Sequence, residues 1–309
     1  MSNLLFKRWN DFGGWLVFLI AAFVYGMTIE PTASFWDCPE FISCAEKLQV
    51  GHPPGAPFYM LVGNLFTQFA SDASQVSGMV NFLNALLSAG CILFLFWSIT
   101  RLVRALLVGD ERKLSVMDVI IILGAGFVGA LAYTFSDTFW FSAVEGEVYA
   151  FSSFLTALVF WMILRWQDEA DSVSGDRWII LIAYIIGLSI GVHLLNLLCI
   201  PAIVLVFYYQ KYQTLSLKGV IGAIALSGIL IVLIPGMADV GGWFELFFVN
   251  VMGLPFQSGL IVFLGLVLFL LIGAIYRFRK RIVNTGLWCL LMLTIGYTTY
   301  AVILIRANA

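Results

Sequence analysis

Two carboxylates and a histidine lie close together in the segment 28–60, TIEPTASFWDCPEFISCAEKLQVGHPPGAPFYM. Asp37 and Glu40 are three positions apart, so a helix here would place both side chains on one face. Two neighbouring carboxylates repel each other and partial burial disfavours ionisation further, so we expect one raised pKa and a group able to accept a proton. The turn GHPPGAP is stiff because proline fixes φ, and it can hold His52 at a defined place. A stiff surface loop with scattered acids is the alternative interpretation.

A second acidic stretch, FSDTFWFSAVEGEVYAFSS, carries Glu145 and Glu147 on either side of a glycine. The pair stands at the start of a predicted helix, where carboxylates interact favourably with the helix dipole. The alternative is that both carboxylates face a polar cavity and contact a hydroxyl-rich substrate. The neighbouring aromatic residues suit either a belt at the membrane interface or stacking on a sugar.

Three further polar residues stand at the ends of apolar runs. His193 and Asn196 lie between two short half-helices in GLSIGVHLLNLLCIP, and polar groups inside a membrane tend to face a cavity or a partner. Arg306 ends the last apolar run, and its guanidinium would match the oxygens of a phosphate. A structural histidine and a snorkelling helix anchor are the alternatives.

The composition predicts an all-α polytopic membrane protein. Of the 309 residues, 61% are hydrophobic and only 11% are charged, whereas a soluble domain carries about 25% charged residues. The net charge of −2 gives no indication of a nucleic-acid partner. A spanning helix needs about 20 apolar residues, and about nine such segments are present. The predicted spans are 14–29, 77–100, 118–136, 149–166, 178–192, 194–209, 219–236, 259–276 and 284–305.

The basic residues predict the orientation of these spans. With a cytoplasmic amino terminus, every Lys and Arg except Lys47 and Arg306 falls inside, which is a strong positive-inside bias. The two acidic stretches then face the outer side. No small-residue cleavage site follows the first apolar run, so we expect a retained helix and not a removed signal peptide.

Two segments are predicted to lie in the membrane interface instead of crossing it. The first is a helically periodic stretch near 58–69, within a first outer loop at 30–76, and it is too short for a span of about 20 residues. The second is 237–258, which is aromatic and interrupted by glycine. We expect the whole chain, 1–309, to form one transmembrane domain.

The five cysteines leave at least one thiol unpaired. Cys38 and Cys44 stand in the first outer loop, where a disulfide between them is an alternative to two free thiols. The other three lie in apolar runs and are expected in the core: Cys91, Cys199 and Cys289.

The stretch WDCPEFISCAEKLQVGHPPGAPFYML resembles the first outer loop of protein O-mannosyltransferases. Those enzymes have an Asp-Glu pair after the first helix and a His-Pro-Pro motif that opens an interfacial helix. Together with the second acidic stretch and DRWIILIAYIIGLSIGVHLLNLLCIP, it is similar to a bacterial multi-pass family related to a eukaryotic transmembrane O-mannosyltransferase, from about residue 14 to 210. All resemble the GT-C superfamily, whose donors are polyprenyl-phosphate sugars. Here Cys38 and Pro39 interrupt the Asp-Glu pair, which departs from the mannosyltransferase pattern.

The resemblance implies a GT-C-like bundle in a bacterial inner membrane, with its active face in the periplasm. It implies transfer of a sugar, such as mannose, from a polyprenyl-phosphate carrier to a protein or glycan hydroxyl, with inversion at the anomeric carbon. Asp37 takes the place of the superfamily's catalytic aspartate and would be the general base, with Glu40 as the second carboxylate. Arg306, with His52 or His193, would hold the leaving phosphate. The residues expected to orient sugar or acceptor are Glu40, Glu145, Glu147 and Asn196.

Other interpretations stay open at this point. No metal ligand set is assigned, and Mg²⁺ or Mn²⁺ held by carboxylate oxygens is an alternative. A transporter would place charges at the bilayer midplane, and a non-catalytic scaffold subunit would tolerate changes at Asp37, Glu40 and His52. Because relatives of the bacterial family continue into more helices or a soluble outer domain, we expect this chain to be a fragment or a short member.

Overall fold

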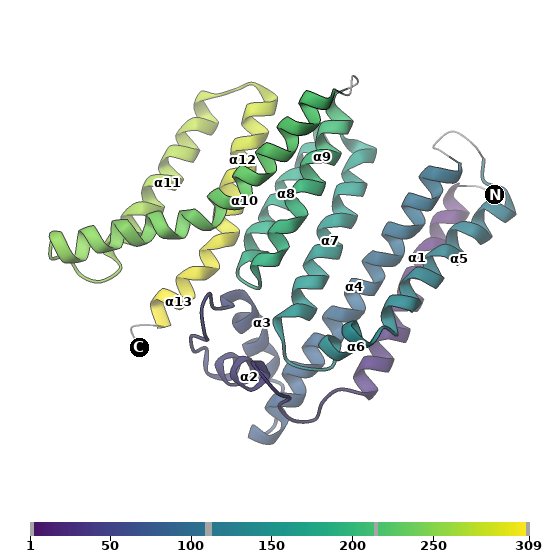
Figure 1. Cartoon of the computed structure of the whole chain (residues 1–309), viewed down its shortest axis with the longest axis horizontal. Helices are drawn as coiled ribbons and strands as arrows, with labels where there is room; N and C mark the ends of the chain where they lie inside the picture. The colour runs from purple at the N-terminus through teal and green to yellow at the C-terminus, as the bar shows by residue number, and fades with distance from the viewer. Residues whose placement is uncertain (1–2, 109–112, 213–215, 307–309) are drawn as a thin grey trace. The chain divides into compact units, whose positions relative to one another are not determined.

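The computed structural model describes residues 3–108, 113–212 and 216–306, and these residues form helices and no strand (Figure 1). They divide into two compact units. Unit 1 comprises residues 1–164, 189–196 and 305–309, and unit 2 comprises residues 165–188 and 197–304. The predicted all-α polytopic membrane fold is confirmed.

Among the described residues, eight helical segments are long and apolar enough to cross a membrane. They coincide with eight of the nine predicted spans. The remaining prediction, 178–192, falls on α8 (Val173–Ile190), an 18-residue helix that is not one of the eight. Asp176 stands in the first turn of α8, and Arg177 follows it.

Unit 1 is built on three long helices that pack against one another: α1 (Asn3–Met27), α4 (Val76–Leu107) and α5 (Val116–Thr134). The core between them is mainly apolar, because the buried faces of the three helices carry mostly small, aliphatic and aromatic side chains. Its fully buried members include Val17, Ala21, Tyr25, Ile92, Phe96 and Ala130.

Three short helices of unit 1 lie in the segments predicted to be outside the membrane. They are α2 (Cys38–Lys47), α3 (Pro57–Thr67) and α6 (Asp137–Ala143). The longer α7 (Val148–Glu169) begins in unit 1, directly after Glu147 and within the second acidic stretch. The stretch predicted as a short interfacial helix is therefore helical, and α3 is not among the candidate spans.

Unit 2 contains most of α8 together with α9 (Cys199–Lys211), α10 (Leu217–Leu246), α11 (Ser258–Arg277) and α12 (Arg281–Tyr297). The last described helix, α13 (Ala301–Arg306), begins in unit 2. α8 and α12 approach closely at Gly187 and Gly296, where a Cβ on Gly187 would stand 2.3 Å from the Leu293 carbonyl oxygen. Small residues permit such close helix packing in membranes.

Most of the segment 237–258, which is predicted to lie in the membrane interface, is helical. α10 continues through Pro235 to Leu246 and is followed by a π-helical turn at Phe247–Val251. Proline lacks an N–H, but membrane helices tolerate it where neighbouring groups satisfy the freed carbonyl. Within 237–258 only the turn before α11 is non-helical, and Gly241 and Gly242 stand inside α10.

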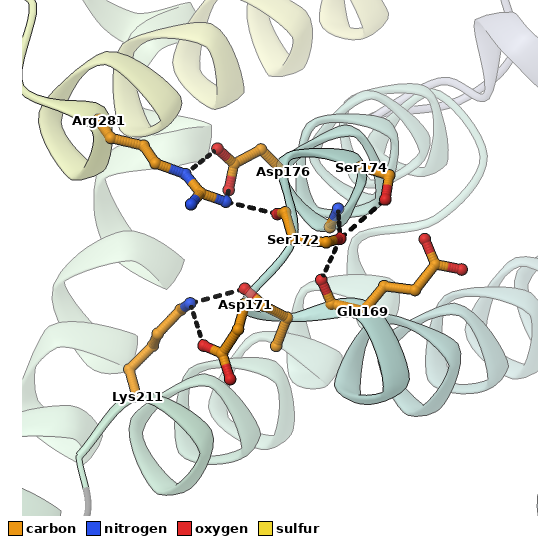
Figure 2. A network of polar contacts seen from close by, with 9 residues as sticks. Glu169, Asp171, Ser172, Ser174, Asp176, Lys211 and Arg281 are labelled. Atoms are coloured by element: carbon orange, nitrogen blue, oxygen red, sulfur yellow. Dashed lines mark hydrogen bonds and ion pairs between the residues drawn. The ribbon is translucent and has the colours of Figure 1, made fainter.

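A polar network in unit 2 ties together three segments that the positive-inside pattern places on one side (Figure 2). Arg281, at the start of α12, donates to Asp176 with Nε 2.7 Å from Oδ2. Lys211, at the end of α9, donates to the Ala170 carbonyl at 2.7 Å. The turn between α7 and α8 therefore contacts the ends of α9 and α12, as expected if all three face the same side.

Candidate active site

α2 explains the two residues that interrupt the Asp-Glu pair. Asp37 is the N-cap residue of α2, and Pro39 stands in the first turn, where the N–H that proline lacks has no helical partner. Glu40 is also in the first turn, where a carboxylate interacts favourably with the helix amino terminus. The side chain of Asp37 makes no capping hydrogen bond. The insertion of Cys38 and Pro39 is thus the beginning of a helix that places both carboxylates at one end.

His52 lies between the two carboxylates. Oε1 of Glu40 accepts the backbone N–H of His52 at 2.6 Å, and Oε2 is 3.0 Å from the ring Nδ1. The other ring nitrogen, Nε2, is 3.9 Å from Oδ2 of Asp37. All three side chains are partly exposed to solvent. Glu40 therefore orients the imidazole, and Nε2 faces Asp37.

The pKa of Glu40 differs from the expectation of a raised pKa in the carboxylate pair. The hydrogen bonds from the His52 side chain and backbone lower the pKa of Glu40. The same side-chain bond raises the pKa of His52, and the charges of Glu40 and Asp37 act in the same direction. The expectation is wrong for Glu40, because the hydrogen bonds from His52 stabilise the ionised form of this carboxylate.

The His-Pro-Pro turn is closed by its own backbone and fixed to the neighbouring chain. The N–H of Gly55 donates to the His52 carbonyl at 2.8 Å, and Gly55 has a φ of +70°, which favours glycine. α3 begins directly after this turn, and the Gly191 carbonyl accepts the N–H of Phe58 at 2.7 Å. The backbone position of His52 is therefore set from both sides.

The carboxylate with a strongly raised pKa is Glu147. Glu145 and Glu147 are both buried, with relative exposures of 6% and 7%. Burial, followed by the charges of Glu145 and Asp37, raises the pKa of Glu147 to about 7. Burial also raises the pKa of Glu145. A Cβ on Gly146 would stand 3.1 Å from Cγ1 of Ile42 in α2, so the turn that carries Glu147 lies against α2, and the charges of Asp37 and His52 act on Glu147.

Two asparagines that the sequence analysis did not identify hold these stretches in place. Asn81 and Asn84 lie one turn apart on α4 and have no exposed surface. Asn81 donates to the Thr32 carbonyl at 2.9 Å, and Asn84 donates to the Glu147 carbonyl at 2.6 Å. The N–H of Glu30 also donates to the Val144 carbonyl at 3.0 Å. Two amides at i and i+3 within an apolar helix were the available signal, because polar groups are rare there.

His193 and Asn196 have different surroundings. The ring of His193 lies beside Tyr149, with centroids 5.4 Å apart, and burial lowers the pKa of this histidine. Asn196 is buried, and its amide oxygen accepts from the hydroxyls of Ser152 and Thr156, both at 2.8 Å. Asn196 therefore braces α7 against the helix break, and its predicted contact with substrate is not supported by this geometry.

Arg306 lies at the other end of α2 from the carboxylates. Its Nε donates to the Leu48 carbonyl at 2.8 Å, and its Nη2 donates to the Lys47 carbonyl at 3.1 Å. These carbonyls end the ten-residue α2, which is about 15 Å long. Arg306 therefore contacts the end of α2 that is remote from Asp37, and its expected role in holding a phosphate stays a prediction.

The structure decides between a disulfide and two free thiols at Cys38 and Cys44. Cys38 and Cys44 are buried free thiols, and six residues of one helix separate them by about 9 Å, beyond the reach of a disulfide.

Asp37, Glu40 and His52 each offer one ligand atom within 4.8 Å of the others, a set of oxygen and imidazole ligands that suits Mn²⁺ better than Mg²⁺. Both Glu40 oxygens already bind His52, so a cation held by all three would have to replace that contact.

Known proteins match the segment of the chain that contains Asp37, Glu40, His52 and Glu147. Residues 37–216 match the model of a family described as the protein O-mannosyl-transferase TMEM260 N-terminal domain. The chain is 23% identical over 201 residues to protein O-mannosyl-transferase tmem260 of Dictyostelium discoideum, covering 63% of this chain and 22% of that protein. It is 28% identical over 209 residues to protein O-mannosyl-transferase TMEM260 of Mus musculus, covering 66% of this chain and 27% of that protein. The chain thus matches about a quarter of the length of these relatives. No solved structure matches it.

Proposed function

The chain belongs to the family of the protein O-mannosyl-transferase TMEM260 N-terminal domain, and we propose from this premise that it takes part in transferring a sugar to a protein hydroxyl. The donor in this proposal is a hexose, such as mannose, on a polyprenyl-phosphate carrier. The acceptor is a Ser or Thr side chain that arrives from the water on the outer face. The membrane is a bacterial inner membrane, with the amino terminus in the cytoplasm and the site in the periplasm.

The observation that carries this proposal is the placement of His52 between Asp37 and Glu40, in the segment that the family model matches. A transferase that uses a lipid-linked sugar needs a base for the acceptor beside a group that stabilises charge on the leaving phosphate. Here a carboxylate and an imidazole with a raised pKa lie side by side at a helix amino terminus. This arrangement supports transfer better than a role in transport.

In the proposed reaction, Asp37 accepts the proton of the acceptor hydroxyl. The hydroxyl oxygen forms a bond to the anomeric carbon, the bond from that carbon to the phosphate oxygen breaks, and the polyprenyl phosphate leaves with the electron pair. The configuration at the carbon is inverted. His52, held by Glu40, stabilises the negative charge on the departing phosphate. Glu147 stands close enough for its charge to interact with both groups, and it orients a sugar hydroxyl.

The experiment is sugar transfer in membranes that contain the full protein, with a labelled polyprenyl-phosphate hexose as donor. A positioned base contributes about 10²–10⁴-fold, so we expect Asp37→Asn to lose at least about 10²-fold in rate. Asp72→Asn is the matched control, because Asp72 is an aspartate of the same outer segment that caps a short helix through Ser74. Equal rates in both variants would reject Asp37 as the base and favour a non-catalytic scaffold.

A further inference from the structure

Asn84 lies where three segments of the candidate site meet. It is on α4, an apolar helix of spanning length, and its side chain has no exposed surface. An amide buried without hydrogen bonds costs about 2–7 kcal/mol, so an asparagine at this position must be bound on most sides. The hydrogen-bond partners of Asn84 therefore indicate its structural role.

The partners of Asn84 come from the acidic turn and from α3. Its amide nitrogen donates to the backbone carbonyls of Glu145 and Glu147, the second at 2.6 Å. Its amide oxygen accepts from the hydroxyl of Tyr59 at 3.2 Å. Both amide hydrogens are thus used, and they hold two carbonyls that are two residues apart. A Cβ on Gly146, between them, would crowd the side chains packed against the turn, so the turn cannot shift easily.

Tyr59 extends this contact to the histidine. Tyr59 is fully buried, and its ring centroid lies 5.7 Å from that of Phe41. Phe41 follows Glu40 in α2, and its ring centroid is 5.7 Å from that of His52. A single amide is therefore connected by direct contacts to the acidic turn, to α3 and, through two rings, to His52.

We propose that Asn84 is a positioning residue of the transferase site, which fixes the Glu147 carboxylate relative to Asp37 and His52. The inference rests on the proposed function. Asn84 itself touches neither the sugar nor the acceptor. It acts by holding the backbone on both sides of Gly146, and thereby the direction from which Glu147 enters the site.

The protonation of Glu147 reports this position. The charged groups that act on it are Glu145, Asp37 and His52, and burial is the largest cause of its raised pKa of about 7. If the turn were released, the carboxylate could reach water, and its pKa would move toward the ordinary value of 4.5. A change in this pKa can be measured without any sugar transfer.

The deciding variant is Asn84→Asp, which keeps the size of the side chain but cannot donate to two carbonyls. Tyr59→Phe removes only one hydrogen bond of Asn84 and leaves the ring packing intact. The matched control is Ser88→Ala, one turn further along α4, because Ser88 is equally buried but its hydroxyl has no hydrogen-bond partner. Thermal unfolding, measured in membranes, shows whether each variant is folded.

Two measurements are made on each variant. The first is modification of Glu147 by a water-soluble carbodiimide as a function of pH, quantified by mass spectrometry, because only the protonated carboxyl reacts. We expect a midpoint near 7 in the wild type and in Ser88→Ala, and a midpoint displaced from 7 in Asn84→Asp. The second is sugar transfer, where we expect kcat of Asn84→Asp to fall by about 10²-fold with KM for the donor unchanged.

The outcomes separate this inference from the proposed function. Wild-type midpoint and kcat in Asn84→Asp would overturn the positioning role. A shifted midpoint in a protein whose wild type transfers no sugar would reject the transferase proposal, while the hold of Asn84 on the acidic turn would stand. If Asn84→Asp does not fold, Tyr59→Phe decides: a lower midpoint and lower kcat support the inference, and wild-type values of both overturn it.

Discussion

Glu40 binds His52 twice, through the backbone N–H at 2.6 Å and through the ring Nδ1 at 3.0 Å. One contact fixes the chain and the other fixes the ring, so the imidazole has a single orientation relative to α2. The two carboxylates therefore differ in their partners, because both oxygens of Glu40 contact His52 whereas the side chain of Asp37 makes no capping hydrogen bond.

The first prediction concerns this pairing. Glu40→Gln removes the negative charge that raises the pKa of His52, so the imidazole should lose its proton at a lower pH. If protonated His52 stabilises the leaving phosphate, the alkaline limb of the pH–rate profile should move to lower pH and kcat at pH 7 should fall by about 10-fold or more. An unchanged alkaline limb would mean that His52 does not act in its charged form.

The second prediction concerns stability. The pKa of Glu147 is raised in the folded protein, so the folded state binds this proton more tightly than the unfolded state does. The stabilisation that protonated Glu147 contributes is fully present below about pH 4.5 and is lost as the pH rises through about 7. The difference between the two values corresponds to about 3 kcal/mol.

Glu147→Gln should therefore unfold at a higher temperature than the wild type at pH 8, with a much smaller difference at pH 5. The measurement is thermal unfolding in nanodiscs at both pH values. Glu46→Gln, which changes an exposed glutamate of α2, is the control and should show no such dependence. A Glu147→Gln protein that matches the wild type at both pH values would show that Glu147 is not held in a site that disfavours its charge.

The third prediction concerns Arg306. Because its guanidinium binds the Lys47 and Leu48 carbonyls, Arg306→Gln should loosen the end of α2 and lower kcat by roughly 10-fold, as expected for a small displacement of a catalytic group. The KM for the lipid-linked donor should not change. Lys47→Gln is the control, since only the backbone of Lys47 takes part. A raised KM for the donor in Arg306→Gln, but not in Lys47→Gln, would support the predicted phosphate-binding role of Arg306.

The fourth prediction concerns metal removal. Since both oxygens of Glu40 bind His52, we expect sugar transfer to be unchanged after dialysis against EDTA. The measurement is the transfer rate before and after chelation, followed by addition of Mn²⁺ or Mg²⁺. Loss of transfer that Mn²⁺ restores would instead assign Asp37, Glu40 and His52 as ligands.

The spanning helices could be predicted from the sequence because a run of apolar residues is a local property. A helix that carries Asp37 and Glu40 was considered from their spacing, but Cys38 and Pro39 were not recognised as its first turn, where proline is common. The position of Arg306 could not be predicted, since its partner Leu48 lies 258 residues away. The same holds for Asn84, whose amide hydrogen bonds depend on a turn more than sixty residues away (separation 61).

The unused side chain of Asp37 at the helix amino terminus has a consequence for how such a protein can change. A capping Asp, Ser or Asn commonly adds about 1 kcal/mol to a helix, and α2 does without that gain. A serine at position 37 that caps α2 would yield a more stable protein, and under the proposed function it would remove the base for the acceptor hydroxyl. Selection for thermal resistance alone would therefore favour loss of activity at this position, and retention of the aspartate in a mutated population would report that the reaction is still required.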